Sequence, residues 1–90
     1  MEAYEGIYKN AKIRVEMSLS KINLIINGKV SDTMKRGLKE AFQNYTLQTV
    51  IVIDGEELVV VAQIKTQLQV FVQAPEVYVG NTKIPMIQVS

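Results

Sequence analysis

Residues 46–64 read TLQTVIVIDGEELVVVAQI and carry the strongest structural signal in the chain. Residues 46–53 are rich in β-branched side chains, which favour strands. Asp54-Gly55 follows, and this dipeptide is typical of a two-residue hairpin turn because both residues accept a positive φ. The chain then returns as a second apolar run over residues 56–64. These residues predict a β-hairpin.

Two segments of this hairpin, residues 50–53 and 58–62, are apolar at every position. Strands of this composition are usually covered on both faces of their sheet. One helix can cover only one face. We therefore expect the other face to be covered by the remaining strands of the chain or by another subunit.

A helix is predicted before the hairpin. Ser31-Asp32-Thr33 supplies residues typical of a helix N-cap, and Asn44 is a suitable stop. Between them the apolar residues recur at helical spacing: Met34, Leu38, Ala41, Phe42 and Tyr45. This spacing predicts an amphipathic helix with its apolar face on the sheet.

The other segments are predicted to be strands. Residues 12–19 alternate strictly between apolar and polar side chains, which indicates a half-buried strand. Further strands are expected at 22–26, ended by Asn27-Gly28, at 68–73, and in a final hairpin formed by 77–79 and 83–89. Pro85 favours an edge position for the last strand. Residues 1–10 show no period and are compatible with an N-terminal arm.

The expected fold class is therefore α+β, as a single β-rich domain over residues 1–90 in the order β-β-α-β-β-β-β-β. One amphipathic helix packs on a bent sheet or a small barrel or sandwich. The helix followed by five short strands resembles the Sm-like order, and the compact set of strands is similar to that of OB-folds.

The composition excludes much of the usual enzyme chemistry. The chain has no His and no Cys, so Ser-His and Cys-His nucleophile pairs and the usual zinc sites are excluded. Asp54, Glu56 and Glu57 cluster at the hairpin turn but lack the spacing of a calcium loop. We expect no enzyme, no catalytic residue, no metal and no cofactor.

Charge supplies one alternative function. Eight of the ten Lys and Arg lie in residues 1–45. Cations and aromatic rings on a β surface can bind single-stranded nucleic acid. An OB-like or Sm-like module would use these residues: Lys9, Lys12, Arg14, Lys21, Tyr4 and Tyr8. Glu16 shares the predicted strand face of Arg14, which weakens this interpretation.

Two long segments with almost no charged residues indicate a protein interface instead. Residues 41–53 contain no charged side chain, and within 58–75 only Lys65 is charged. Long uncharged β segments pair readily with other strands, so a protein that keeps them usually buries them. A neutral polar row with one aromatic ring has the composition of an interface: Gln67, Gln69, Phe71 and Gln73.

The leading hypothesis is a non-enzymatic protein that assembles as a homo-oligomer or binds a heterologous protein partner. A virion or tail component, or a small accessory protein of a mobile element, would suit so short a chain. No apolar run is long enough for a transmembrane helix, so we expect no membrane association. The expected location is the cytoplasm, or the virion if the protein is viral.

Overall fold

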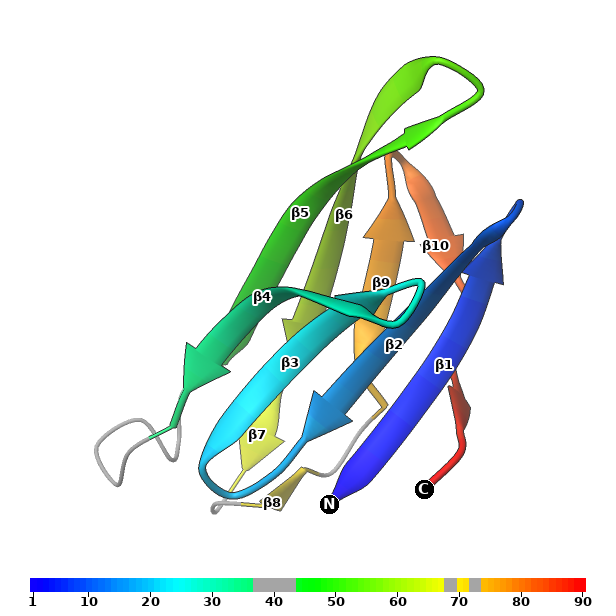
Figure 1. Cartoon of the computed structure of the whole chain (residues 1–90). Coiled ribbons are helices and arrows are strands. Elements are labelled where there is room, and N and C mark those ends of the chain that lie inside the picture. Colours follow the sequence, from blue (N-terminus) through cyan, green and yellow to red (C-terminus); the bar gives the residue numbers. More distant parts are fainter. Residues whose placement is uncertain (37–43, 68–69, 72–73) are drawn as a thin grey trace.

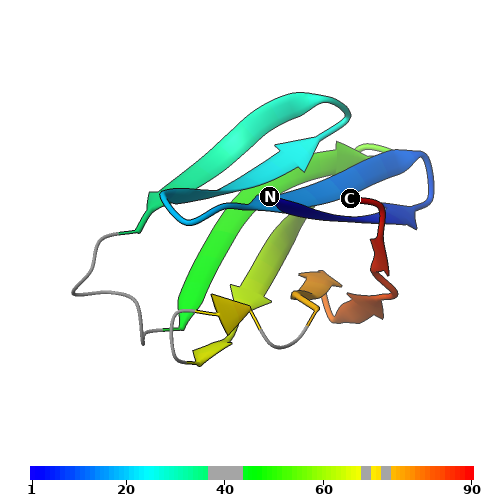
Figure 2. The same ribbon diagram turned by 90° about the horizontal axis from the view of Figure 1, so that it is seen from below.

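The computed structural model describes residues 1–36, 44–67, 70–71 and 74–90, and in these residues the protein is all β. Two antiparallel sheets face each other as a sandwich (Figures 1 and 2). Sheet A has the strand order β11-β1-β2-β3-β4, and sheet B has the order β10-β9-β6-β5. The strands of sheet A are β1 (Glu2–Tyr8), β2 (Ala11–Met17), β3 (Lys21–Ile26), β4 (Lys29–Lys35) and β11 (Ile87–Gln88). Sheet B contains β5 (Tyr45–Ile53), β6 (Glu56–Ile64), β9 (Glu76–Val79) and β10 (Thr82–Ile84), and a separate ribbon pairs β7 (Thr66–Gln67) with β8 (Val70–Phe71).

The core lies between the inner faces of the two sheets. Alternate residues of each strand point inward, and these positions are the apolar ones. The β2 strand buries Ala11, Ile13, Val15 and Met17, and opposite them β5 and β6 bury Leu47, Ile51, Ile53, Val60, Ala62 and Ile64. No polar or charged residue is buried in the described part of the chain. Hydrophobic burial is thus the main source of cohesion between the sheets.

The hairpin predicted over residues 46–64 is confirmed. The β5 and β6 strands pair without a break from Tyr45 opposite Ile64 to Ile53 opposite Glu56. Asp54 and Gly55 form the turn with φ values of 52° and 79°. Both angles are positive, as a two-residue hairpin turn of this type requires.

The predicted helix, and with it the α+β fold class, is wrong. The residues expected to cap and begin the helix form strand β4, and Tyr45 begins strand β5. The other residues of the helical pattern lie outside the described residues: Leu38, Ala41 and Phe42. The physical reason is the preceding turn, where Asn27 and Gly28 have φ values of 51° and 84°. This is the same positive-φ hairpin turn as at Asp54-Gly55, so the chain returns as a strand antiparallel to β3.

Asp32 links the two sheets. Its Oδ2 accepts a hydrogen bond from the backbone N–H of Gln48 at 2.9 Å, and its Oδ1 accepts one from the N–H of Thr33 at 2.9 Å. Gln48 belongs to β5, the edge strand of sheet B that lies beside β4 in Figure 1. The carboxylate expected to cap a helix therefore accepts a hydrogen bond from the backbone of an edge strand instead.

The N-terminal segment is built into sheet A. Residues 2–8 form β1, which pairs with β2 along its whole length and with β11 on its other side. The C-terminal residues also bond to β1, since Val89 N–H donates to the carbonyl of Ala3 at 2.8 Å. The chain reaches β11 from sheet B, crossing at Pro85 and Met86. Within the described ranges, no helix has the length and apolar character needed to cross a membrane.

Gly6 makes this crossing sterically feasible, which gives a test of the fold. A Cβ at Gly6 would lie 2.6 Å from the Pro85 carbonyl oxygen and 2.7 Å from Met86 Sδ. The carbonyl is backbone and cannot rotate away. Gly6→Ala should therefore lower the free energy of unfolding by about 1–3 kcal/mol, as overpacking does elsewhere. Urea denaturation measures this. Replacing Gly in a strand interior ordinarily stabilises, so a neutral or stabilising result would contradict the close approach.

Candidate functional site

The predicted interface row falls at the limits of the described structure. Gln69 and Gln73 lie outside the described residues. Gln67 and Phe71 belong to β7 and β8, where Gln67 pairs with Val70 and Thr66 pairs with Phe71. The positions of the Gln67 and Phe71 side chains also lie outside what is described. The proposed contact through these four residues stays a prediction.

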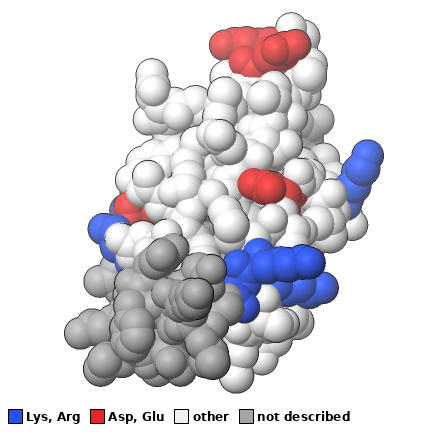
Figure 3. Space-filling view, turned by 90° about the vertical axis from the view of Figure 1, so that its left-hand side faces the viewer, with Lys and Arg blue, Asp and Glu red and all other residues white. Residues whose placement is uncertain are grey.

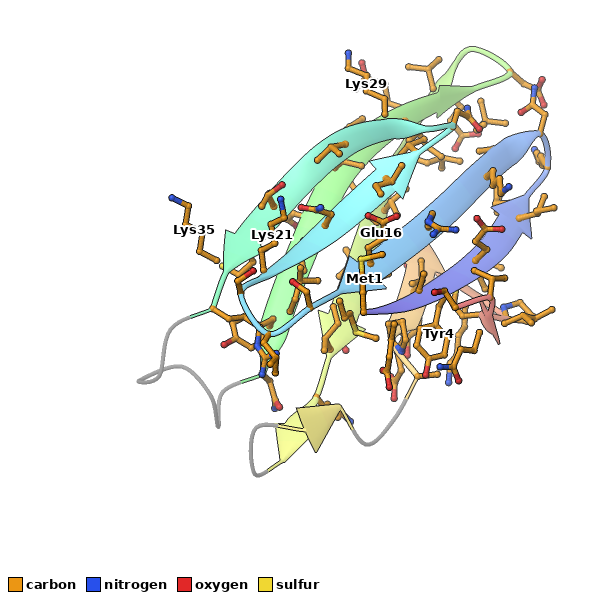
Figure 4. The ribbon with its side chains drawn as sticks, turned by 60° about the horizontal axis from the view of Figure 1, so that its bottom comes forward. Met1, Tyr4, Glu16, Lys21, Lys29 and Lys35 are labelled. Carbon is orange, nitrogen blue, oxygen red and sulfur yellow. The ribbon has the colours of Figure 1, made fainter. Side chains whose placement is uncertain are left out.

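The residues considered for nucleic-acid binding are divided between two faces of sheet A. Tyr4 and Tyr8 pack against the hydrophobic core. Lys12 and Arg14 alternate with the buried residues of β2 and lie on its outer face. Figure 4 looks onto this outer face, with Glu16 near the middle of the sheet. The aromatic rings and these two cations therefore do not form one surface for a nucleotide strand.

Lys9 and Lys21 lie apart from that pair. Lys9, in the β1–β2 turn, has its Nζ 5.7 Å from the centroid of the Tyr8 ring and 3.6 Å from Oδ2 of Asp54. Lys21 stands opposite Lys35 at the far end of β3 (Figure 4). The six predicted residues thus do not gather on one surface, and Lys9 already faces an acid.

The outer face of sheet A carries an ion-pair network centred on Arg14. Its Nη1 donates to Glu5 Oε2 at 2.7 Å, and its Nε donates to Glu16 Oε2 at 2.8 Å. Lys12 Nζ lies 3.3 Å from the second oxygen of Glu5. The side chains of Arg14, Glu5 and Glu16 are 28%, 21% and 23% exposed, so the network is partly shielded from water. Each cation is neutralised by a carboxylate, which makes the surface a poor receptor for phosphate.

The hydrogen bonds of this network move its pKa values away from neutral pH. The hydrogen bond from Arg14, with further contributions from Lys12, holds the pKa of Glu5 below its ordinary value. The same bond, together with that to Glu16, raises the pKa of Arg14. A general acid or base works best when its pKa lies near the working pH. These pKa shifts are those of a structural ion-pair network on sheet A and do not suit a general acid or base.

Two surface hollows adjoin the network. One, of about 310 Å³, is lined by the four charged residues together with Ile25 and Gly28. The other, of about 510 Å³, lies over β1 and β11 and is mostly apolar, lined by Ile7, Pro85, Ile87 and Val89 with Glu5, Gly6 and Lys12. Among the described side chains, no three acidic, His or Cys groups gather closely enough to hold a metal ion.

Part of the outer face of sheet B is formed by exposed apolar side chains. The side chains of Val50, Val52 and Val59 point away from the core and are 56%, 64% and 47% exposed. Val50 stands directly opposite Val59, with Val52 two residues further along β5. The next row across the sheet contains Val61 and Tyr78, both half-buried. These five residues are named the valine face.

Figure 3 looks at the molecule from the side of β4 and β5. Acidic atoms mark the top, where the β5–β6 turn lies, and mostly uncharged atoms lie below it. The strands that form the valine face are recognisable in the sequence, because 50–53 and 58–62 are apolar at every position. Which of their two faces is exposed is seen only in the structure.

Glu5→Gln should reduce stability at neutral pH but not in acid. Because the pKa of Glu5 is lower in the folded protein, its ionised form stabilises the fold above the ordinary carboxyl pKa of about 4.3. This contribution is lost as the pH falls through the lowered value. Urea denaturation at pH 7 and at about pH 3 measures this. The difference in the free energy of unfolding between wild type and Glu5→Gln should be smaller at the lower pH.

Glu56→Gln is the control for this measurement, since Glu56 is exposed and has no ion pair among the described residues. The difference in the free energy of unfolding between Glu56→Gln and wild type should be the same at both pH values. A difference for Glu5→Gln that stays constant between the two pH values would contradict the role of the ionised carboxylate.

Comparison with known proteins adds no further guide to these surfaces. No family model, no curated protein and no solved structure matches the chain. The choice among the surfaces depends on their exposure, contacts and charge.

Proposed function

We propose that the protein is a non-catalytic component of a homo-oligomer, and that it associates through the valine face of sheet B. The observation that carries this proposal is the exposure of Val50, Val52 and Val59 side by side on one sheet. Single exposed apolar residues are ordinary on protein surfaces, whereas contiguous ones mark sites of association.

The arrangement of the valine face supports contact with another β surface. Directly opposed residues of neighbouring strands lie about 5 Å apart, and successive outward residues of one strand about 7 Å apart. Val50, Val52 and Val59 thus form a continuous surface with Val61 and Tyr78 beside them. β-Branched side chains lose little conformational entropy when a partner covers them. This composition suits a dry contact.

The β5 edge of sheet B supports the same proposal. The β5 strand is nine residues long, lies at the edge and contains no charged residue. Edge strands are usually protected by charges, Pro or bulges against pairing with other chains. Asp32 covers the edge at Gln48, beyond which lie Val50 and Val52. An edge of this kind favours a role in assembly.

The alternatives have less support from the described residues. Binding of single-stranded nucleic acid would use Lys12 and Arg14, which are paired with carboxylates, and Tyr4 and Tyr8, which pack on the core. A heterologous protein could also bind the valine face. The solution mass of the purified protein distinguishes this alternative from self-association. A viral or mobile-element origin, and a cytoplasmic or virion location, stay predictions.

Val59→Lys tests the proposed surface. Wild type should give a multimeric mass by size-exclusion chromatography with light scattering. Val59→Lys places a charge on the valine face and should shift the mass to that of the monomer, about a tenfold or greater loss of affinity, since a buried unpaired charge is costly. Because Val59 points outward, the circular dichroism spectrum and the unfolding midpoint of the Val59→Lys variant should stay close to those of wild type.

Ile7→Lys is the matched control. Ile7 is 69% exposed on the other sheet and borders the apolar hollow over β1 and β11. This variant should keep the wild-type mass. If Ile7→Lys dissociates the multimer while Val59→Lys does not, the interface lies on sheet A. A monomeric wild type at all accessible concentrations would refute the homo-oligomer.

A further inference from the structure

The valine face has one acid and one base at opposite corners. Glu57 stands opposite Val52 on the outer face of sheet B. Lys83 stands opposite Tyr78, which in turn stands opposite Val61. All of these positions point to the same side, because directly paired residues of neighbouring strands share a face. Glu57 and Lys83 are both exposed.

Glu57 and Lys83 cannot pair with each other within one chain. They are separated by two strand spacings across the sheet and four residues along it, which places them about 17 Å apart. Neither side chain has a hydrogen bond or ion pair with any described residue. Val59, Val61 and Tyr78 lie between them. Two unpaired opposite charges therefore flank an uncovered apolar surface.

The other charges near this face are already satisfied. Glu76 lies 3.8 Å from Lys65 Nζ and accepts a hydrogen bond from the Tyr78 hydroxyl at 3.2 Å. A partner that covers the valine face thus needs one cation near Glu57 and one anion near Lys83. This is the charge pattern of the valine face itself.

We infer that the occupant of the valine face is a second copy of this chain, related by a two-fold axis lying between the two apposed sheets. The inference rests on the proposed function and names its partner and geometry. The axis passes between Glu57 and Lys83, so that Glu57 of each chain meets Lys83 of the partner subunit. The same rotation brings Val59 over the partner's Tyr78 and Val50 over the partner's Val61. The two sheets cross at a steep angle, as in orthogonal sheet packing.

A two-fold axis makes this charge pattern self-complementary. In such an interface the same patch contributes both halves of every contact, so each pair occurs twice. The apolar residues lie at the centre and the two ion pairs at the rim, which is the usual anatomy of a protein interface. Rim charges contribute chiefly to the choice of partner and orientation, because like charges placed opposite each other are strongly disfavoured.

Charge reversal and mixing test the inference. Glu57→Lys places two Lys-Lys contacts in the homodimer, and Lys83→Glu places two Glu-Glu contacts there. Each variant alone should show a dimer dissociation constant raised about tenfold or more. In a mixture, one chain offers Lys at both positions and the other offers Glu at both, so the heterodimer regains both ion pairs. Light scattering or native mass spectrometry of the equimolar mixture should show the dimer restored.

Glu56→Lys is the matched control for the charge change. Glu56 is adjacent in sequence but pairs with Ile53, whose side chain points toward the core, so it lies on the other side of the β5–β6 turn. Glu56→Lys should dimerise as wild type does. Raising the salt concentration should reduce the difference between the single variants and wild type, since exposed charges are screened.

The outcomes separate this inference from the proposed function. If wild type is multimeric and Val59→Lys dissociates it, but Glu57→Lys and Lys83→Glu associate normally, the valine face stands and the two-fold arrangement is refuted. If both single variants dissociate and their mixture does not recover, the pairing of Glu57 with Lys83 is refuted as well. A monomeric wild type refutes both proposals. Loss of fold cannot imitate the expected result, because two misfolded variants would not restore a dimer when mixed.

Discussion

The burial of one face of β2 and β3 against one face of β5 and β6 is the interaction on which the rest of the structure depends. Ile13, Val15 and Leu24 on one side meet Leu47 and Val60 on the other, and all five side chains are fully buried. With no buried polar or charged residue in the described part of the chain, the core is specified by apolar packing. The register of each strand is therefore set by which residues must point inward. A shift of one residue would expose the apolar set to water.

The same constraint divides the surface into two different faces. On sheet A the outward positions between the buried residues of β2 are Lys12, Arg14 and Glu16, and Glu5 of β1 neutralises the cations. On sheet B the corresponding outward positions of β5 include Val50 and Val52. The network around Arg14 on sheet A therefore satisfies its own charges, whereas the valine face of sheet B leaves contiguous apolar side chains in contact with water. This contrast makes sheet B the better candidate for association.

Closure of the sandwich is unequal at its two sides. Near β1 the chain crosses from β10 to β11 over Gly6, so that both sheets are joined by the backbone itself. Near β4 the described links are made by side chains: the guanidinium carbon of Arg36 lies 5.8 Å from the centroid of the Tyr45 ring, and Asp32 accepts the N–H of Gln48. The upper half of β5, with Asp54 at its turn, extends past these links (Figure 1). Among the described strands, β5 thus has no neighbour in sheet B on its outer side at Val50 and Val52.

Local sequence signals identified the β5–β6 hairpin and excluded chemistry that needs His or Cys. Asp54-Gly55 predicted the β5–β6 hairpin correctly, because a two-residue turn with positive φ depends only on its own residues. Asn27-Gly28 carried the same signal for the β3–β4 hairpin. There the spacing of Met34 and the apolar residues after it also fitted a helix, and the helix prediction failed because strand pairing with β3 outweighs a local period.

Only the tertiary structure decided which surfaces exist. The alternation in β1 is too weak in the sequence to show that Tyr4 faces the core while Glu5 faces outward toward Arg14. That residues 50–53 and 58–62 are apolar on both faces could be predicted, but not which face lacks a cover. The positions of Glu57 and Lys83 at opposite corners of the valine face depend on the register of β6, β9 and β10. Register between strands distant in sequence is fixed by packing of the whole sandwich, and no local pattern contains it.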